Sequence, residues 1–236
     1  YQLIDNLLFL SDLHNAKMQA EELAQQAKNR KNLPYQSLAL MVQVSASFDS
    51  VYPDNIRALL KQAAAFAEEF NDPVLLSRVL GRGSYIYYRQ NDFITLENNL
   101  LRALDLAEAA NAPEQQLEVL HALTIFSYKF KRVDKIDLYL TSAKVVLDKY
   151  QFPGESYALL EDVAGLCSDD PVQKEAFYRQ ALNRFKPEQE AWVKARAQEH
   201  LVNFYIDNER WADAFAVFAA ETDFSGAELF MRAKIH

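Results

Sequence analysis

The sequence predicts an all-α protein: a right-handed superhelical solenoid of antiparallel helix pairs, with about 34–40 residues in each repeat. Three observations lead to this fold class. Among 236 residues there are only five glycines, whereas Ala, Leu, Glu and Gln are abundant, as is typical of helical proteins. Prolines and apolar side chains recur with a period near 40 residues. Sustained alternation of apolar and polar residues, the sign of a strand, is missing from the sequence.

Prolines indicate where the repeats begin. Successive prolines are separated by 39, 40, 40 and 34 residues, at Pro34, Pro73, Pro113, Pro153 and Pro187. Each lies where we expect a helix to start, because the first turn of a helix leaves its N–H groups without a helical partner and proline has none to lose. Pro53 and Pro171 are placed to begin the second helices of their pairs.

The second helices of the repeats share one apolar face. The corresponding residues in three repeats are Ile56, Leu96 and Ile136; Leu60, Leu100 and Leu140; Ala63, Ala103 and Ala143; and Ala67, Ala107 and Leu147. Within each repeat they fall at i, i+4, i+7 and i+11, which is one face of a helix. The same pattern one repeat earlier consists of Ala16, Ala20, Leu23 and Ala27. Alanine at one place in three repeats predicts close approach of the helix axes there.

The elements expected in chain order are helix pairs at 2–12/14–31, 35–49/53–70, 74–90/92–110, 114–131/133–150, 154–167/171–185 and 188–207/210–220. They form one solenoid domain with repeats at 1–32, 33–72, 73–112, 113–152, 153–186 and 187–221, and a capping helix at 224–236. Repeats this small bury their apolar faces only by stacking, which creates a concave groove. Because the chain opens at Tyr1 rather than Met, we expect a piece of a longer protein.

Charge and composition narrow the classes of function. A formal net charge of -8 argues against direct binding of nucleic acid or of an anionic membrane surface, since both need clustered Lys and Arg. No apolar run reaches the length of a membrane span. The single cysteine, Cys167, excludes an intrachain disulfide and is expected to be a small buried side chain. A cytoplasmic and a periplasmic location fit these residues equally.

The helix junction of the third repeat carries a recognisable motif. It reads YYRQNDF at residues 87–93, followed by Leu96 and Ala103. This motif resembles the junction of the tetratricopeptide repeat, Tyr-Tyr-x-x-Gly-Asp-Tyr, which small residues follow at a spacing of seven. Tyr205 and the stretch NERW at 208–211 match the same junction in another way. The chain departs from the family in using Asn or Lys in place of the turn glycine, and in repeats of 40 rather than 34 residues.

The longer repeats resemble tetratricopeptide-like arrays of bacterial signalling proteins. These include input domains of some diguanylate cyclases and histidine kinases, sugar-sensing domains of maltose-type transcription activators, and peptide-pheromone receptors. The resemblance implies a sensory or docking domain that binds a protein, a peptide or a small anionic ligand in its groove. An enzyme is not expected, and neither is a cofactor, because the sequence contains no phosphate-binding glycine loop, nucleophile elbow or helical zinc motif.

In such arrays the first helix of each pair lines the groove, and the resemblance extends this to the present chain. The candidate ligand-binding residues are Arg78, Arg82, Tyr85, Tyr88, Arg89, His121, Tyr128 and Lys129. The three arginines and Tyr85 fall on one face of a helix, and guanidinium groups bind carboxylates with two hydrogen bonds. The alternative is a solvated helix face whose arginines pair weakly with neighbouring acidic residues. Tyr87 and Phe93 are expected to pack in the core.

Two further features of the sequence are open to two interpretations. Gly81 and Gly83 each cost a helix about 1 kcal/mol relative to Ala, and either a ligand approaches the backbone there or the helix packs tightly on the preceding repeat; we favour tight packing. The four histidines lack the spacing of metal ligands, so no metal site is expected.

The alternative function is a structural scaffold that assembles through its terminal helices, for example as a homodimer. The apolar residues that would mediate this are Leu3, Leu7, Phe9, Leu10, Phe224, Leu229 and Phe230.

Overall fold

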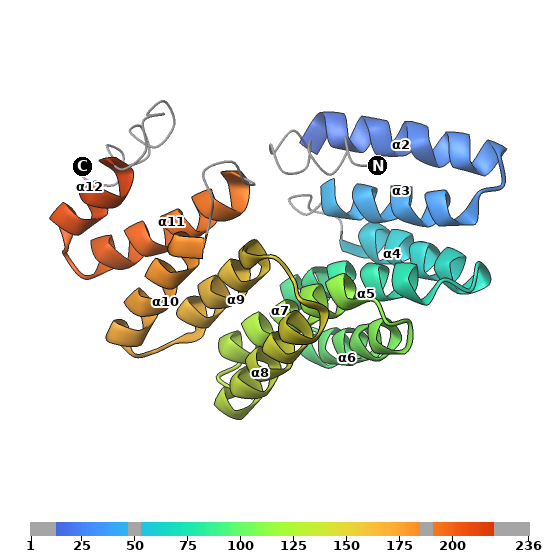
Figure 1. Ribbon diagram of the computed structural model, residues 1–236. Helices are drawn as coiled ribbons and strands as arrows, with labels where there is room; N and C mark the ends of the chain where they lie inside the picture. The colour runs from blue at the N-terminus through green and yellow to red at the C-terminus, as the bar shows by residue number, and fades with distance from the viewer. Residues whose placement is uncertain (1–12, 47–52, 185–190, 220–236) are drawn as a thin grey trace. The chain divides into compact units, whose positions relative to one another are not determined.

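The computed structural model describes residues 13–46, 53–184 and 191–219 (Figure 1). Within these ranges the chain forms α-helices joined by short turns and contains no strand. Contacts group the chain into compact unit 1, Tyr1–Leu123, and compact unit 2, Thr124–His236. The boundary between them falls inside one helix, α7, so its residues up to Leu123 are described with the first unit.

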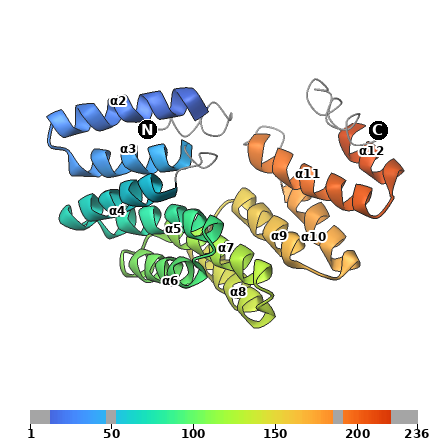
Figure 2. The same ribbon diagram turned by 180° about the vertical axis from the view of Figure 1, so that it is seen from behind.

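Compact unit 1 contains six helices among its described residues, the last of which crosses the boundary. They are α2 (Leu13–Asn29), α3 (Leu33–Ala46), α4 (Pro53–Glu69), α5 (Pro73–Arg89), α6 (Phe93–Ala109) and α7 (Pro113–Lys129). From α2 to α6 each helix packs against the next, and the first helices of successive pairs, α3 and α5, also contact each other. Figures 1 and 2 show α2, α3, α4 and α5 stacked in chain order. This is the stacking of repeated helix pairs that the sequence predicts.

Compact unit 2 repeats the arrangement. Its described helices are α8 (Val133–Tyr150), α9 (Gly154–Cys167), α10 (Pro171–Arg184), α11 (Ala191–Asp207) and α12 (Trp211–Ala219). Each packs on the next, and the first helices α9 and α11 touch. The predicted all-α solenoid class is thus confirmed, and helix bounds agree with prediction to within a few residues. The expected helices at 2–12 and 224–236, and residues 188–190, lie outside the described residues.

The face predicted to be buried forms the core of the helix pairs. Ala63, Ala103 and Ala143 are fully buried, and most of their apolar neighbours along the same face are buried too, whereas Leu140 is half-buried. The absence of a larger side chain lets a serine from the first helix reach the backbone of the second: the Ser37 hydroxyl donates to Ala63 O at 2.8 Å, and Ser77 donates to Ala103 O at 2.6 Å. The two bonds occupy equivalent places in successive repeats, so they fix the same helix register twice.

Helix ends share one backbone geometry. Seven non-glycine residues have positive φ, between 50° and 58°: Lys31, Asn71, Asn91, Asn111, Lys131, Gln151 and Glu209. Gln151 directly follows its helix, and each of the other six is the second residue after a helix end. The N–H of the next residue bonds to a carbonyl five residues back, as Asp92 N does to Tyr87 O at 2.9 Å. This is the Schellman motif, which usually takes glycine at the left-handed position. Other residues therefore take the place of the turn glycine and adopt the same left-handed conformation.

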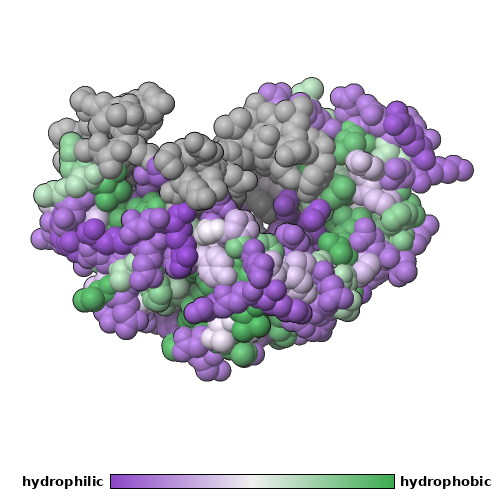
Figure 3. Space-filling model, viewed as in Figure 1, coloured by the Kyte–Doolittle hydropathy of each residue, from purple (hydrophilic) through white to green (hydrophobic). Residues whose placement is uncertain are grey.

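Polar side chains cover parts of the surface of the described helices. Figure 3 shows hydrophilic side chains gathered at the end of α2 that leads into α3. The exposed residues of this helix include Glu21, Glu22, Gln25 and Gln26. None of the described helices combines the length and the hydropathy that crossing a membrane requires.

Candidate functional site

Helix α5 positions the predicted arginine and tyrosine residues. Its start is fixed by Asp72, whose carboxylate accepts a hydrogen bond from Leu75 N at 2.9 Å, and by Pro73 in the first turn. One face of the helix, including Val79 and Ile86, is buried in compact unit 1. The opposite face keeps all the predicted residues at least partly exposed, so α5 presents a row of side chains on the surface of that unit.

Two of the arginines contact the neighbouring helix α7. Arg82 Nε lies 3.2 Å from Glu118 Oε1, with both side chains partly exposed. Arg78 Nε lies 3.5 Å from Gln115 Oε1, the upper limit for a hydrogen bond. Arg82 therefore agrees with the alternative prediction of a solvated arginine that pairs weakly with a neighbouring acidic residue. Arg78 has no carboxylate partner among the described residues.

The aromatic residues of α5 form a surface pair. Tyr85 is 43% exposed, and its ring stacks on Tyr88 with 6.2 Å between ring centroids and 29° between ring planes. Tyr88 also meets Phe93 at 6.2 Å. Tyr87 is buried, as predicted, but Phe93 remains 38% exposed because it is the first residue of α6 and lies at the edge of the pair. Prediction of core packing for Phe93 was thus wrong.

The other predicted residues are divided between the compact units. Arg89 is exposed at the end of α5, and His121 is half-buried on α7. Tyr128 and Lys129, at the end of α7, belong to compact unit 2. Tyr128 packs against the core cluster that contains Val163, and burial, with a smaller contribution from nearby acidic groups, raises the pKa of its hydroxyl. The structure brings together the α5 residues and leaves Tyr128 largely a packing residue.

The two glycines of α5 have different surroundings. A Cβ atom added to Gly83 would lie 2.5 Å from both methyl groups of Leu60 on α4, far closer than atoms pack. A Cβ atom added to Gly81 would lie 3.6 Å from Val119 and 3.8 Å from Gln115 Nε2, which are ordinary contacts. The packing interpretation is therefore confirmed for Gly83, where α5 approaches the preceding repeat. Gly81 faces α7 without such crowding.

A buried amide group lies beside Gly81. Gln115 is only 3% exposed, and its Nε2 has no hydrogen-bond partner among the described residues. Its neighbour Gln116, also buried, donates from Nε2 to Ala107 O at 3.2 Å. An unsatisfied buried donor costs about 1–3 kcal/mol, so such groups are rare and call for an explanation. Sequence patterns gave no sign of it, because the amide's isolation depends on how α5 and α7 pack.

Compact unit 2 contains a buried acidic residue that the sequence did not single out. Asp162 on α9 is 1% exposed and accepts hydrogen bonds from Arg196 Nη2 at 2.8 Å and Arg196 Nε at 3.1 Å. His200 Nδ1 lies 2.7 Å from its other oxygen. These contacts of the Asp162 carboxylate all join α9 to α11, the first helices of successive pairs. The centroid of the His200 ring lies 5.8 Å from that of the Tyr178 ring. Because these contacts join two successive first helices, the network has a structural role: it holds neighbouring repeats together.

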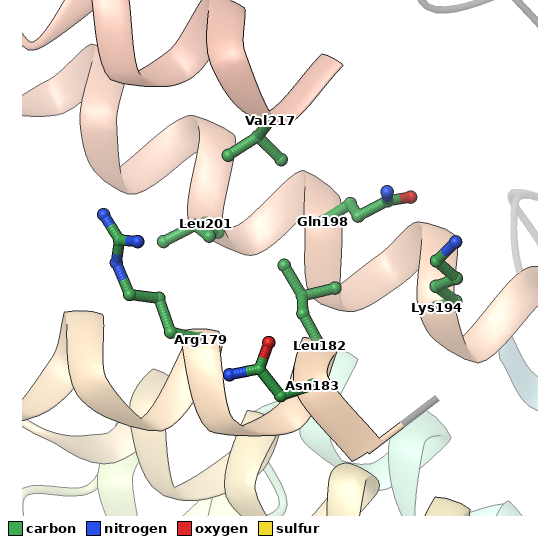
Figure 4. Close-up of a pocket in the computed structure, with 7 residues that line it drawn as sticks. All are labelled: Arg179, Leu182, Asn183, Lys194, Gln198, Leu201 and Val217. Atoms are coloured by element: carbon green, nitrogen blue, oxygen red, sulfur yellow. The ribbon is translucent and has the colours of Figure 1, made fainter. Parts of the chain in front are cut away.

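A pocket of about 310 Å³ lies between α10, α11 and α12. Figure 4 shows the apolar side chains of Leu182, Leu201 and Val217 around its centre, with Arg179 and Lys194 toward the edge. Arg179 is engaged by Glu175 at 2.9 Å. No group of three or more potential metal ligands occurs among the residues that the structure describes. The pocket is thus lined by three apolar residues together with the polar residues Arg179, Asn183, Lys194 and Gln198.

No protein-family model and no curated protein matches the chain. Solved structures do: 34 chains match, among them the crystal structure of BtubC (BKLC) from P. vanneervenii. That match has a TM-score of 0.69 at 14% sequence identity and covers 90% of this chain and 93% of the other. The shared property is the helical fold. It agrees with the stacking of helix pairs seen within each compact unit.

Proposed function

We propose that the chain is a non-catalytic, tetratricopeptide-like repeat module that binds a protein segment or peptide on the surface formed by α5 and α7. In this proposal it serves as the sensory or docking domain of a bacterial signalling or regulatory protein. The junction motif at residues 87–93 and the stacked helix pairs support the tetratricopeptide-like assignment. Binding there would favour one arrangement of the repeats over others and so bias an attached output domain.

The observation that carries the proposal is the exposed tyrosine pair on α5. Tyr85 and Tyr88 stack on each other at the surface, and Arg89 and Arg82 lie on the same helix. Tyrosine and arginine are enriched at the centres of protein interfaces, since each combines a large apolar area with polar groups at its end. Large apolar rings cost free energy in water unless a partner covers them. A helix that buries one face and exposes such residues on the other is therefore suited to binding.

The proposal is tested by selecting binders from a displayed library of random peptides and measuring their affinity by fluorescence anisotropy. The double variant Tyr85→Ala/Arg89→Ala should keep its helical circular dichroism and lose at least about tenfold in affinity, the size expected for central interface residues. The matched control is Ile94→Ala/Arg102→Ala, which removes one exposed apolar residue and one exposed arginine from α6. Equal affinities of both variants and of the unaltered chain would refute the proposal.

A second candidate function is a scaffold that assembles through α12. Trp211 and Phe215 are 45% and 60% exposed and lie four residues apart, so they share one face of that helix. Under this alternative the chain forms oligomers that dissociate on dilution, and Trp211→Ser/Phe215→Ser gives monomers. Light scattering after size-exclusion chromatography decides: monomers of the unaltered chain at all concentrations would exclude the scaffold, and peptide selection would be unaffected by the α12 substitutions.

A further inference from the structure

We infer that the α5–α7 surface contains a site for a single carboxylate, bound by the guanidinium group of Arg78 and the side-chain amide of Gln115. This rests on the proposed function and names the chemistry of the segment bound there. Two neighbouring donor groups carry the inference. Gln115 Nε2 is buried without an acceptor, and Arg78 makes one long hydrogen bond, 3.5 Å, to the oxygen of the same amide.

The orientation of the Gln115 amide follows from its neighbour. Arg78 has only donors, so the atom that faces its Nε must be the amide oxygen. The nitrogen then points elsewhere, and Gly81, which contributes no side chain, leaves ordinary contact distance to it. Together the two residues present several N–H groups with one weak acceptor between them. This arrangement therefore has enough donors and lacks an acceptor.

Local charge selects a carboxylate over a phosphate. Arg82 is already paired with Glu118, so Arg78 supplies the one uncompensated positive charge of the α5–α7 contacts described above. A carboxylate carries one negative charge and two oxygens, and can accept from the guanidinium group and the amide together. A phosphate monoester carries nearly two charges at neutral pH and would leave one of them unmatched beside Glu118.

The tyrosine pair extends the specificity to a second position. Arg78 and Tyr85 are seven residues apart on one helix face, which corresponds to about 10.5 Å along the axis. An extended peptide covers that distance in about three residues. The preferred segment thus has an acidic residue at Arg78 and an apolar residue three positions away on the tyrosines. Because Nε2 itself is buried, a carboxylate reaches it only when side chains of the α5–α7 contact rearrange, and Arg78 then gives up its 3.5 Å hydrogen bond to Gln115 Oε1.

Side-chain amide resonances in the NMR spectrum of the full chain provide a direct test. The probes are blocked peptides Ac-Glu-Ala-Ala-Leu-NH2 and Ac-Leu-Ala-Ala-Glu-NH2, the same peptides with Gln in place of Glu, and Ac-Leu-Ala-Ala-Gly with a free carboxyl terminus. Sodium acetate and inorganic phosphate complete the set. We expect an acidic probe and acetate to shift the Gln115 amide signals, whereas those of Gln116, whose amide is already bonded, stay in place.

Gln115→Leu separates a ligand contact from a structural role. It removes a buried donor that has no partner, at the cost of the long hydrogen bond from Arg78, and fills the space with an apolar side chain, so the thermal midpoint should stay the same or rise. Affinity for the acidic peptide should fall about tenfold, the value of a hydrogen bond to a charged group. Arg78→Gln should weaken binding by at least as much. The control Gln116→Leu should leave peptide affinity unchanged.

The outcomes are distinct. If the Gln peptides bind as well as the Glu peptides while still perturbing α5 and α7, the carboxylate site is wrong and the proposed function stands. If no peptide perturbs α5 or α7, both the carboxylate site and the proposed function are wrong. Equal shifts with phosphate and acetate would overturn the selectivity for a single charge. A shift with the free carboxyl terminus alone would support the site and assign its source to a chain end.

Discussion

Replacement of the two α5 glycines by alanine should have opposite effects on stability. Both residues lie inside one helix and neither has positive φ, so the intrinsic gain from alanine is the same at each, about 1 kcal/mol. Their surroundings differ. Gly83 faces Leu60 of the preceding pair and Gly81 faces α7 at ordinary contact distance. The pair therefore isolates the contribution of close helix approach.

The magnitude follows from the distances. Carbon atoms pack at about 3.5–4.0 Å, so a Cβ at 2.5 Å from both Leu60 methyl groups overlaps them by at least about 1 Å. Leu60 is itself buried and cannot rotate into solvent. Overpacking of this kind costs about 1–3 kcal/mol, and with two methyl groups displaced we take the upper end. Gly83→Ala should therefore destabilise the chain by about 2 kcal/mol net, and Gly81→Ala should stabilise it by about 1 kcal/mol.

Urea unfolding followed by circular dichroism measures both changes. A double-mutant cycle adds the decisive control: Leu60→Ala removes the obstructing methyl groups, so Gly83→Ala should stabilise the chain when it is introduced into that variant. If Gly83→Ala were stabilising in the original background, the close approach would be absent. If it were equally destabilising with and without Leu60, the explanation by contact with this side chain would be refuted.

Three further predictions concern other parts of the chain. Hydrogen bonds, first from Arg210 and then from Tyr205, lower the pKa of Glu175 from its ordinary 4.5 to about 2, so the stabilisation that Glu175 gives is present above pH 4.5 and is lost as pH falls toward 2. The urea midpoints of the chain and of Glu175→Gln should therefore differ at pH 6 and converge near pH 2. A difference that stays constant with pH would contradict the ion pairing. Burial raises the pKa of Cys167 to about 12, so 5,5′-dithiobis(2-nitrobenzoic acid) should label it at pH 8 only after unfolding, and fast labelling of the native chain would disprove its burial. Lys131→Gly should raise stability by about 1 kcal/mol, because lysine holds a left-handed conformation with φ of 56°, and no gain in the urea midpoint would show that the turn carries no strain.

The fold was predictable because its main signals are local and periodic. Several helix starts are marked by a proline, as at Pro53, Pro73 and Pro113, and the buried face repeats every 40 residues in three repeats, as Ile56, Leu96 and Ile136 illustrate. Such periodic signals can be recognised in the sequence without any knowledge of tertiary contacts. Even the missing turn glycines did not mislead, because Asn and Lys adopt the same left-handed conformation at the helix ends.

The candidate site was predictable only in part. The exposed row on α5 follows from helical periodicity, so Arg78 and Tyr85 were placed correctly on one face. Pairings between repeats, such as Arg82 with Glu118, depend on how far one helix slides along the next, which the sequence does not encode locally. For the same reason the isolated amide of Gln115 and the buried carboxylate of Asp162 were not foreseen. Both are products of packing between first helices.

The central claim, that the chain binds peptides on the α5–α7 surface, is tested most directly by mapping the footprint of a selected peptide. Backbone amide shifts in the NMR spectrum would be recorded for the full chain with and without the strongest binder from the library. We predict that the perturbed residues cluster around Tyr85 on α5 and Gln115 on α7. Perturbation confined to the pocket lined by Leu182, Leu201 and Val217, with α5 and α7 unchanged, would contradict the claim.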